Sequence, residues 1–328
     1  MDIAIIGSGH IGSRHLQSMS KLDDSSNIFV VDPSIESLKS AENHYKEVNL
    51  KCQHNLTFTT NLNEIPKVLD GVIIATSSMM RKEVIKQLLY HANSIQFLIL
   101  EKFLFPSIDD FQEVKTILQE KGILNYTYVN CTRREYPFYH FLKSKLKTSQ
   151  FINFRVSGSN VGLGSNGVHY LDIFSYLIND NDINIYFSEL DNIILPSKRE
   201  GYIEFTGKLK GVSDKKMKAD ITIESFKEPN IPITITIESD NLKCIINKKE
   251  KNILLFQKQN QWKEEYIDYP NILISEVSHV IIKKLFEQKQ CNLTPYLKSM
   301  ELHQLLLREF LRKLSYIEGK RVTICPIT

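Results

Sequence analysis

The chain has 328 residues and a formal net charge of +3 at pH 7, with 24% charged and 42% hydrophobic residues. This length allows two domains that each bury a core of their own. Lysine and arginine are spread along the chain rather than gathered in a stripe, so the charge pattern points to neither a nucleic acid nor a membrane partner.

The cysteines and the apolar runs indicate which kind of protein this is and in which compartment it is expected. The five cysteines are far apart, with no C-x-x-C pair and no Cys/His cluster at metal-ligand spacing. No apolar run approaches the roughly 20 residues that span a bilayer, and the N-terminus does not resemble a signal peptide. We therefore expect a cytoplasmic protein with reduced thiols and no metal site.

The first predicted element is a short apolar strand over residues 3–6, which breaks at once into a G-x-G-x-x-G turn that opens a helix. In a dinucleotide site the first glycine permits the tight turn, the second lets backbone N–H groups approach a pyrophosphate, and the third lets the helix lie close to the strand. The helix N-terminus adds donors for the phosphates. The predicted cofactor residues here are Gly7, Gly9, His10, Ile11 and Gly12.

Asp32 closes the second apolar run, residues 28–31, and follows Gly12 by 20 residues. An acid at this distance accepts hydrogen bonds from the adenosine ribose 2′-OH and repels a 2′-phosphate. The sequence therefore predicts NAD in preference to NADP. A turn that binds no phosphate is the alternative interpretation.

Helix-like segments and apolar runs alternate up to about residue 130. Strands are predicted over residues 57–59, 71–76, 97–103 and 125–130, and helices over 34–45, 62–70, 81–92 and 108–122. This order predicts an α/β Rossmann domain, a doubly wound parallel sheet, over residues 1–125. Thr76 and Ser77 end one of the strands, at the edge where ligands meet such a sheet, and are predicted to contact the cofactor.

The pattern then changes to that of an α+β domain over residues 126–328. A helix over 135–146, a strand over 150–158, a glycine-rich loop over 162–167 and a helix over 168–178 are followed by period-two alternation near 203–205, 221–223 and 233–237. Such alternation predicts a large, mostly antiparallel sheet with one apolar face. Helices over 274–288 and 297–316 are expected to cover a sheet or the domain interface.

Glu101 and Lys102 directly follow four apolar residues at a predicted strand end. An ionised pair there is costly unless something pairs or uses it. Desolvation and a neighbouring positive charge can bring the pKa of a lysine into the range of a working acid or base. The alternative is a solvated pair at the sheet edge.

His169 and Asp172 are three residues apart and share one face of a predicted helix. Histidine titrates near neutrality, and an acid beside it can orient it for proton transfer. The glycines before it are expected to free the backbone to shape a pocket. A packing role for the histidine is the alternative.

Asn130, Arg133 and Arg134 follow the sixth predicted strand, again at the ligand edge. Together with Tyr136 they are placed to fix hydroxyls and an anionic group of a substrate, because guanidinium pairs with carboxylate or phosphate. We expect one arginine of the pair to cap a helix or meet solvent instead.

These stretches together resemble the Gfo/Idh/MocA family of nucleotide-dependent oxidoreductases over nearly the whole chain. The resemblance is carried by AIIGSGHIGSRH, by GVIIATSS followed by LILEKFLF, and by GVHYLDIFSYL. It implies that Lys102 is the catalytic lysine beside the nicotinamide and that His169 is a second acid/base or substrate-binding group. It also implies a homodimer or homotetramer formed through the C-terminal sheet.

Three positions depart from the family pattern. Phe103 stands where the Glu-Lys-Pro motif has proline, and Ser165 stands four residues before His169, where many members have aspartate. Arg81 replaces a histidine that often follows the fourth strand. If Arg81 faces the cleft it favours an anionic substrate, and solvent exposure on the next helix is the alternative.

The sequence thus predicts an NAD-dependent dehydrogenase that acts on a hydroxyl carbon of a sugar, sugar acid or nucleotide sugar. The N-x-V-H-Y-L-D segment is similar to members of bacterial surface-sugar or nonulosonic acid pathways. Lys102 and His169 are the predicted catalytic residues, and Glu101 joins the cofactor set. The predicted substrate-binding residues are Asn130, Arg134, Asn166, Asp172 and Arg81.

Two alternatives remain. The enzyme can retain NAD and use it transiently for an epimerisation or elimination, or the protein can be a non-catalytic NAD-binding regulator.

Overall fold

The computed structural model describes residues 1–48, 51–215, 217–269 and 272–328. The chain divides into two compact units: unit 1 comprises Met1–Phe105, Asp109–Thr132 and Ile272–Leu297, and unit 2 comprises Pro106–Ile108, Arg133–Asn271 and Lys298–Thr328. The division therefore differs from the predicted boundary between residues 125 and 126, because a late segment of the chain returns to unit 1.

Unit 1 is built on a seven-stranded sheet with the order β17-β6-β5-β4-β1-β2-β3. All neighbouring strands run parallel except β17, which is antiparallel to β6. This confirms the predicted doubly wound parallel sheet. The strands are β1 (Asp2–Ile6), β2 (Asn27–Val31), β3 (Asn55–Thr59), β4 (Val68–Ile74), β5 (Ser94–Leu100), β6 (Thr127–Val129) and β17 (Thr294–Pro295).

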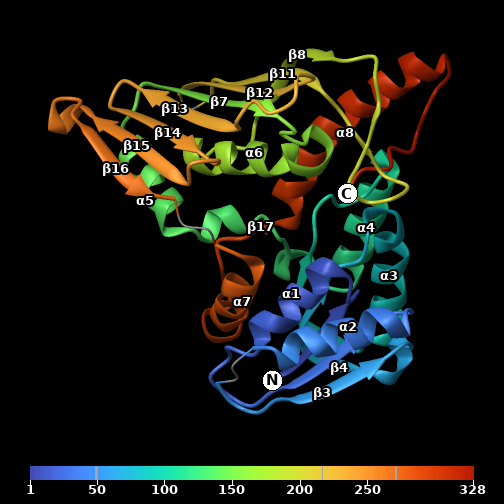
Figure 1. The fold of residues 1–328 in the computed structure, drawn as a ribbon. Coiled ribbons are helices and arrows are strands. Elements are labelled where there is room, and N and C mark those ends of the chain that lie inside the picture. The colour runs from blue at the N-terminus through green and yellow to red at the C-terminus, as the bar shows by residue number, and fades with distance from the viewer. Residues whose placement is uncertain (49–50, 216, 270–271) are drawn as a thin grey trace. The chain divides into compact units, whose positions relative to one another are not determined.

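The late segment of unit 1 packs on its first helix, and Figure 1 shows α1 and α7 side by side. His15 Nδ1 lies 2.8 Å from Ser278 Oγ, and Ser18 Oγ lies 3.0 Å from His279 Nδ1. The helices of this unit are α1 (His10–Met19), α2 (Ile35–Lys46), α3 (Ser78–His91), α4 (Ile108–Glu120) and α7 (Ile274–Gln288).

The helix predicted over residues 62–70 is wrong. Only Leu62–Glu64 form a short 3-10 helix, and Val68 already begins β4. Pro66 has no N–H to donate and disfavours the helical conformation of the residue before it. The apolar residues that follow pair instead with β5, Val68 opposite Ser94.

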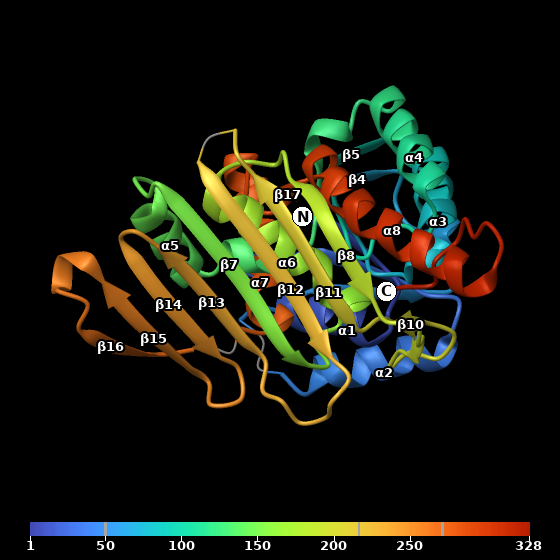
Figure 2. The same ribbon diagram turned by 90° about the horizontal axis from the view of Figure 1, so that it is seen from above.

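Unit 2 contains an eight-stranded sheet with the order β16-β15-β14-β13-β7-β12-β11-β8 (Figure 2). Its neighbours are antiparallel except for β7 and β12, which run parallel, so the predicted mostly antiparallel sheet is confirmed. The strands are β7 (Phe151–Ser159), β8 (Asn184–Leu190), β11 (Gly207–Ser213), β12 (Lys218–Phe226), β13 (Thr234–Ser239), β14 (Leu242–Asn247), β15 (Asn252–Gln257) and β16 (Glu264–Asp268).

Helix α6 covers one face of this sheet, against β7 and β12 (Figure 1). The apolar side chains that alternate along β12 and β13 are buried, including Ile221, Ile223, Ile235 and Ile237. Unit 2 also contains α5 (Pro137–Leu146), α6 (Leu163–Ile178), the short helix η3 (Thr132–Glu135) from Arg133 on, and α8 (Tyr296–Glu318) from Lys298 on. No helix among the described residues is long and apolar enough to cross a membrane.

Two predictions for this unit are corrected. Ile203 belongs to a separate two-stranded sheet of β9 (Leu195–Pro196) and β10 (Ile203–Glu204), and Phe205 stacks on Phe310 with ring centres 4.5 Å apart. An alternating pair this short carries no information about which sheet it joins.

The predicted glycine-rich loop is mostly helix, because α6 begins at Leu163. A Cβ on Gly164 would come within 2.9 Å of Glu204 Oε1, and a Cβ on Gly167 within 3.2 Å of Leu306. These glycines therefore allow close packing around α6 rather than a mobile pocket wall. Glycine is unfavourable inside a helix, so local propensity favours a loop here.

Candidate functional site

The glycine turn follows β1 and has the geometry that a phosphate site requires. Gly7 has φ of 92°, and a Cβ there would lie 2.9 Å from the backbone nitrogen of Thr76. A Cβ on Gly12 would overlap the carbonyl oxygen of Gly7, so only glycine lets α1 begin this close to the turn. Around Gly9, by contrast, no atom of the described residues lies within 4 Å of an added Cβ. The turn therefore leaves open space where a ligand can approach the backbone.

The N-terminus of α1 offers polar groups to that space. Gly9 is the N-cap residue, and no side chain of the described residues caps the helix there. The hydroxyls of Ser8 and Thr76 are buried and form no hydrogen bond within the described part of the chain. His10 is exposed and Ile11 half-buried at the helix start. Uncapped N–H groups, a positive helix end and two hydroxyls fit the diphosphate of a dinucleotide.

Asp32 lies directly beside the glycine turn. Its carboxylate accepts hydrogen bonds from the backbone N–H of Ser8 at 2.7 Å and of Ser34 at 2.9 Å. The side chain is half-buried at the end of β2. An acid fixed in this way can accept from a ribose hydroxyl next to the diphosphate position.

The sheet order brings further predicted residues to the same edge. Because β1, β4, β5 and β6 are successive neighbours and run parallel, their carboxyl ends meet at one edge. Gly7, Thr76, Glu101 and Asn130 follow these ends. Ser77, the N-cap of α3, comes next after Thr76.

Glu101 is a buried carboxylate, so the prediction's alternative of a solvated edge pair is wrong for this residue. The residue is 5% exposed, Oε1 lies 2.9 Å from His15 Nε2, and Asn130 Nδ2 donates to the same oxygen. Burial raises the pKa of Glu101, but its contacts with His15, the charge of Lys102 and the Asn130 hydrogen bond outweigh this, so the pKa lies below its usual value. The carboxylate is therefore ionised at neutral pH.

Asn130 has capacity left for a ligand. Its Oδ1 is buried and forms no hydrogen bond with any residue that the structure describes. Sequence reasoning missed His15 as the partner of Glu101, although its place on the buried face of α1 was a signal.

Arg81 holds the segment that follows Lys102. Lys102 is half-buried, its peptide bond to Phe103 is cis, and the Phe103 side chain is fully buried. The guanidinium of Arg81 donates to the carbonyls of Phe103, Leu104 and Thr76, with 3.0 Å to Leu104. Arg81 is 1% exposed, so solvent exposure is wrong. Its predicted substrate contact finds no support, since backbone carbonyls use the buried guanidinium.

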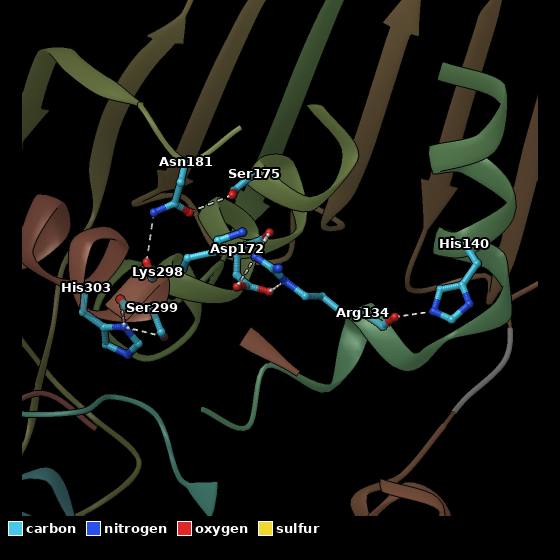
Figure 3. A network of polar contacts seen from close by, with 8 residues as sticks. All are labelled: Arg134, His140, Asp172, Ser175, Asn181, Lys298, Ser299 and His303. Atoms are coloured by element: carbon cyan, nitrogen blue, oxygen red, sulfur yellow. Dashed lines mark hydrogen bonds and ion pairs between the residues drawn. The ribbon is translucent and has the colours of Figure 1, made fainter. Parts of the chain in front are cut away.

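In unit 2, Arg134 and Asp172 bind each other (Figure 3). Nε and Nη2 of Arg134 each lie 2.8 Å from a different carboxylate oxygen of Asp172, and both residues are buried. His140 donates to the Arg134 carbonyl. A buried bidentate pair satisfies both charges. The two predicted substrate contacts therefore find no support, because each residue uses its charge on the other.

Glu204 places a carboxylate beside Ser165, the position at which this chain lacks the expected aspartate. It accepts from Ser165 Oγ at 2.6 Å and from the backbone N–H of Ser165 and Gly164, so it caps α6. Asn166 follows, and half-buried His169 lies one helical turn after Ser165. Sequence reasoning missed Glu204, because it lies 39 positions from Ser165 and leaves no local signal.

Among the described residues, no group of three or more His, Cys, Asp or Glu side chains could hold a metal ion. The five cysteines are free thiols.

Comparison with known proteins adds a family model. Residues 1–128 match the model described as an oxidoreductase family with an NAD-binding Rossmann fold. No curated protein sequence matches the chain.

Solved structures match over nearly the whole chain. The super-repressor mutant of Gal80p from Saccharomyces cerevisiae is 15% identical, with a TM-score of 0.69 over 98% of this chain and 97% of that one. An oxidoreductase from Agrobacterium radiobacter in complex with NAD+, L-tartaric acid and magnesium is 14% identical, with a TM-score of 0.66 over 93% of each chain. UDP-N-acetylglucosamine 3-dehydrogenase from Acidithiobacillus ferrooxidans is 11% identical, with a TM-score of 0.63 over 94% of this chain and 96% of that one. Identities this low show a shared fold.

Proposed function

Because residues 1–128 match the model of the Gfo/Idh/MocA oxidoreductase family, we propose that the protein is an NAD-dependent dehydrogenase acting on a hydroxyl carbon of a sugar, sugar acid or nucleotide sugar. The observation that carries the proposal is the carboxyl edge of the unit 1 sheet. There the uncapped glycine turn and two buried hydroxyls stand ready for a diphosphate, and ionised Glu101 precedes Lys102. Asp32 supports NAD over NADP.

Each residue at this edge has a distinct proposed role. NAD, when bound, supplies the hydride acceptor. The glycine turn binds its diphosphate and Asp32 its adenosine ribose. Glu101, held by His15 and Asn130, fixes the strand end from which Lys102 extends. Lys102 takes the hydroxyl proton as the substrate carbon loses its hydride, and returns it in the reverse direction. His169 acts as the second acid/base or substrate-binding group.

The central test is Lys102→Met. Turnover is expected to fall by roughly 10² or more, because the proton acceptor is lost, while calorimetry shows that NAD still binds. Lys121→Met is the matched control, since Lys121 is exposed at the end of α4 and its loss leaves turnover unchanged. Wild-type turnover in the Lys102→Met variant would remove this lysine from the mechanism.

The substrate is found by following NADH formation with nucleotide sugars, sugar acids and simple polyols. The Agrobacterium structure holds a hydroxy acid, and the Acidithiobacillus enzyme is named for a nucleotide sugar, so these two classes come first. Faster turnover of simple polyols would count against the proposed substrate class.

The likeness to Gal80p favours a second candidate, a non-catalytic NAD-binding regulator. Phe103 and Ser165, which replace usual family residues, are consistent with it. Single-turnover mixing of NAD-loaded protein with each sugar separates the two. Reduction of the bound NAD by any sugar excludes the regulator, and NADH that forms but stays bound through gel filtration indicates an enzyme that retains its cofactor.

A further inference from the structure

Unit 2 gathers two cations around one buried tyrosine. The guanidinium carbon of Arg133, in η3, lies 4.5 Å from the ring centre of Tyr170 on α6. Lys248, which follows β14, donates to the Tyr170 hydroxyl at 2.9 Å, and its Nζ lies 5.2 Å from the same ring centre. Three elements far apart in sequence thus converge on Tyr170.

Within the part of the chain that the structure describes, these two cations form no ion pair with a carboxylate. No aspartate or glutamate within the described ranges forms an ion pair with Arg133 or Lys248, whereas the adjacent Arg134 has Asp172. Nη1 of Arg133 is buried and donates to no residue in the described part of the chain. A buried, charged donor without an acceptor is costly, and one reason for a fold to keep it is a ligand that supplies the acceptor.

The surroundings favour the charge of Arg133 and oppose that of Lys248. Burial opposes the charge of Arg133, but interactions with Tyr170, Tyr139 and Tyr269 outweigh it and hold the pKa of Arg133 above its usual value. Burial raises the pKa of Tyr170, but Arg133 and Lys248 outweigh this and hold it below its usual value. Burial and the charge of Arg133 lower the pKa of Lys248. A nearby anion would stabilise the charged form of such a lysine, because it offsets both the burial and the neighbouring positive charge.

We propose that Arg133 and Lys248 bind the anionic group, a carboxylate or a phosphate, of the ligand that unit 2 accepts. Guanidinium presents a planar fork of donors that matches either anion, and the ammonium adds a point charge. Arg133 thereby takes the role that the sequence suggested for Arg81 and Arg134. The proposal that these two residues bind an anion depends only on the Arg133–Tyr170–Lys248 cluster and not on the proposed function. That the anion belongs to the oxidised sugar rests on the proposed function, and it makes the substrate a sugar acid or a phosphate-bearing sugar.

The test uses three probes that differ only at carbon 6: D-glucuronate, D-glucose 6-phosphate and D-glucose. Calorimetry on the full-length protein is expected to show that at least one anionic probe binds roughly tenfold or more tightly than glucose, since charge-assisted hydrogen bonds are lost with the neutral probe. The two anionic arms tell carboxylate from phosphate.

Variants locate the site. Arg133→Gln and Lys248→Gln are expected to abolish the preference for the anion, whereas Lys248→Arg retains it. Arg155→Gln and Lys249→Gln are matched controls at exposed positions, the second next to Lys248, and they keep the preference. If Arg133→Gln fails to fold, the pair Lys248→Gln and Lys248→Arg decides: loss in the first with retention in the second supports the site, and equal preference in both overturns it.

The inference is overturned if wild-type protein binds neither anion more tightly than glucose, including the case in which no probe binds. It is also overturned if folded Arg133→Gln keeps the preference. An anion preference without any NAD reduction leaves this inference standing and counts against the proposed function. If a neutral sugar reduces NAD and the protein shows no anion preference, the proposed function stands and this inference is overturned.

Discussion

Three arginines that look alike in the sequence differ in what their guanidinium groups touch. Arg81 donates to backbone carbonyls, Arg134 pairs with Asp172, and Arg133 lies over Tyr170 with a buried nitrogen that no described residue satisfies. The first two therefore stabilise the fold, because their charges are already used within it. Arg133 keeps a buried Nη1 donor that no described residue uses, and its guanidinium is paired with no carboxylate in the described part of the chain.

The charge of Asp32 is expected to set the choice of cofactor. Asp32→Asn keeps one of the two oxygens that accept from the N–H groups of Ser8 and Ser34, and it removes the charge that repels a 2′-phosphate. The ratio of NADP to NAD affinity should rise by roughly tenfold or more, measured by titration calorimetry. Asp24→Asn, at an exposed position, should leave the ratio unchanged. An unaltered ratio in Asp32→Asn would place the 2′-position of the ribose elsewhere.

Helix α6 carries a cap that its own sequence does not contain. Its first turn has no acidic residue, and the carboxylate of Glu204 from β10 binds the N–H groups there. An anion at this position is favoured by the unpaired N–H groups and by the helix dipole. Glycines within the helix allow this close approach.

The cap leads to a prediction about two substitutions that each destabilise the protein but whose effects are not additive. Glu204→Gln should lower the free energy of unfolding by about 1 kcal/mol, because a charged cap is lost. Ser165→Asp, which restores the usual family residue, should also destabilise the protein, because two carboxylates then face each other. Combined, the changes should cost less than their sum, since the glutamine relieves the repulsion. Urea unfolding midpoints measure this, with exposed Glu200→Gln as control. Simple additivity would show that the two side chains do not interact.

At the scale of the whole molecule, unit 1 is assembled from distant parts of the chain. Strand β17 pairs with β6, and α7 packs on α1 through Ser278 and His279. One of these contacts reaches His15, the partner of Glu101. The late segment thus supports the strand edge that carries Lys102.

This arrangement predicts which regions loosen together. Ile282→Ala on α7 removes a fully buried side chain, which typically costs about 2–5 kcal/mol. Hydrogen exchange should then accelerate first in α1. The matched control, Leu306→Ala on α8, should instead accelerate exchange in α6, whose Gly167 it contacts. Faster exchange in α6 rather than α1 after Ile282→Ala would contradict the assignment of α7 to unit 1.

The sequence by itself determined the parallel sheet, the mostly antiparallel sheet and the glycine turn with Asp32, because periodicity and glycine spacing are local properties of a chain. It did not reveal the short turn at Pro66 or the helical start of α6, where local propensity competes with pairing and packing. Only the tertiary structure decided that Glu101 meets His15, that Ser165 meets Glu204, and that Arg134 rather than Arg133 is paired with an acid. These partners lie between 38 and 86 residues apart in the sequence. The interaction of two charged or polar groups depends on the distance between them in space, and local sequence patterns do not reveal that distance.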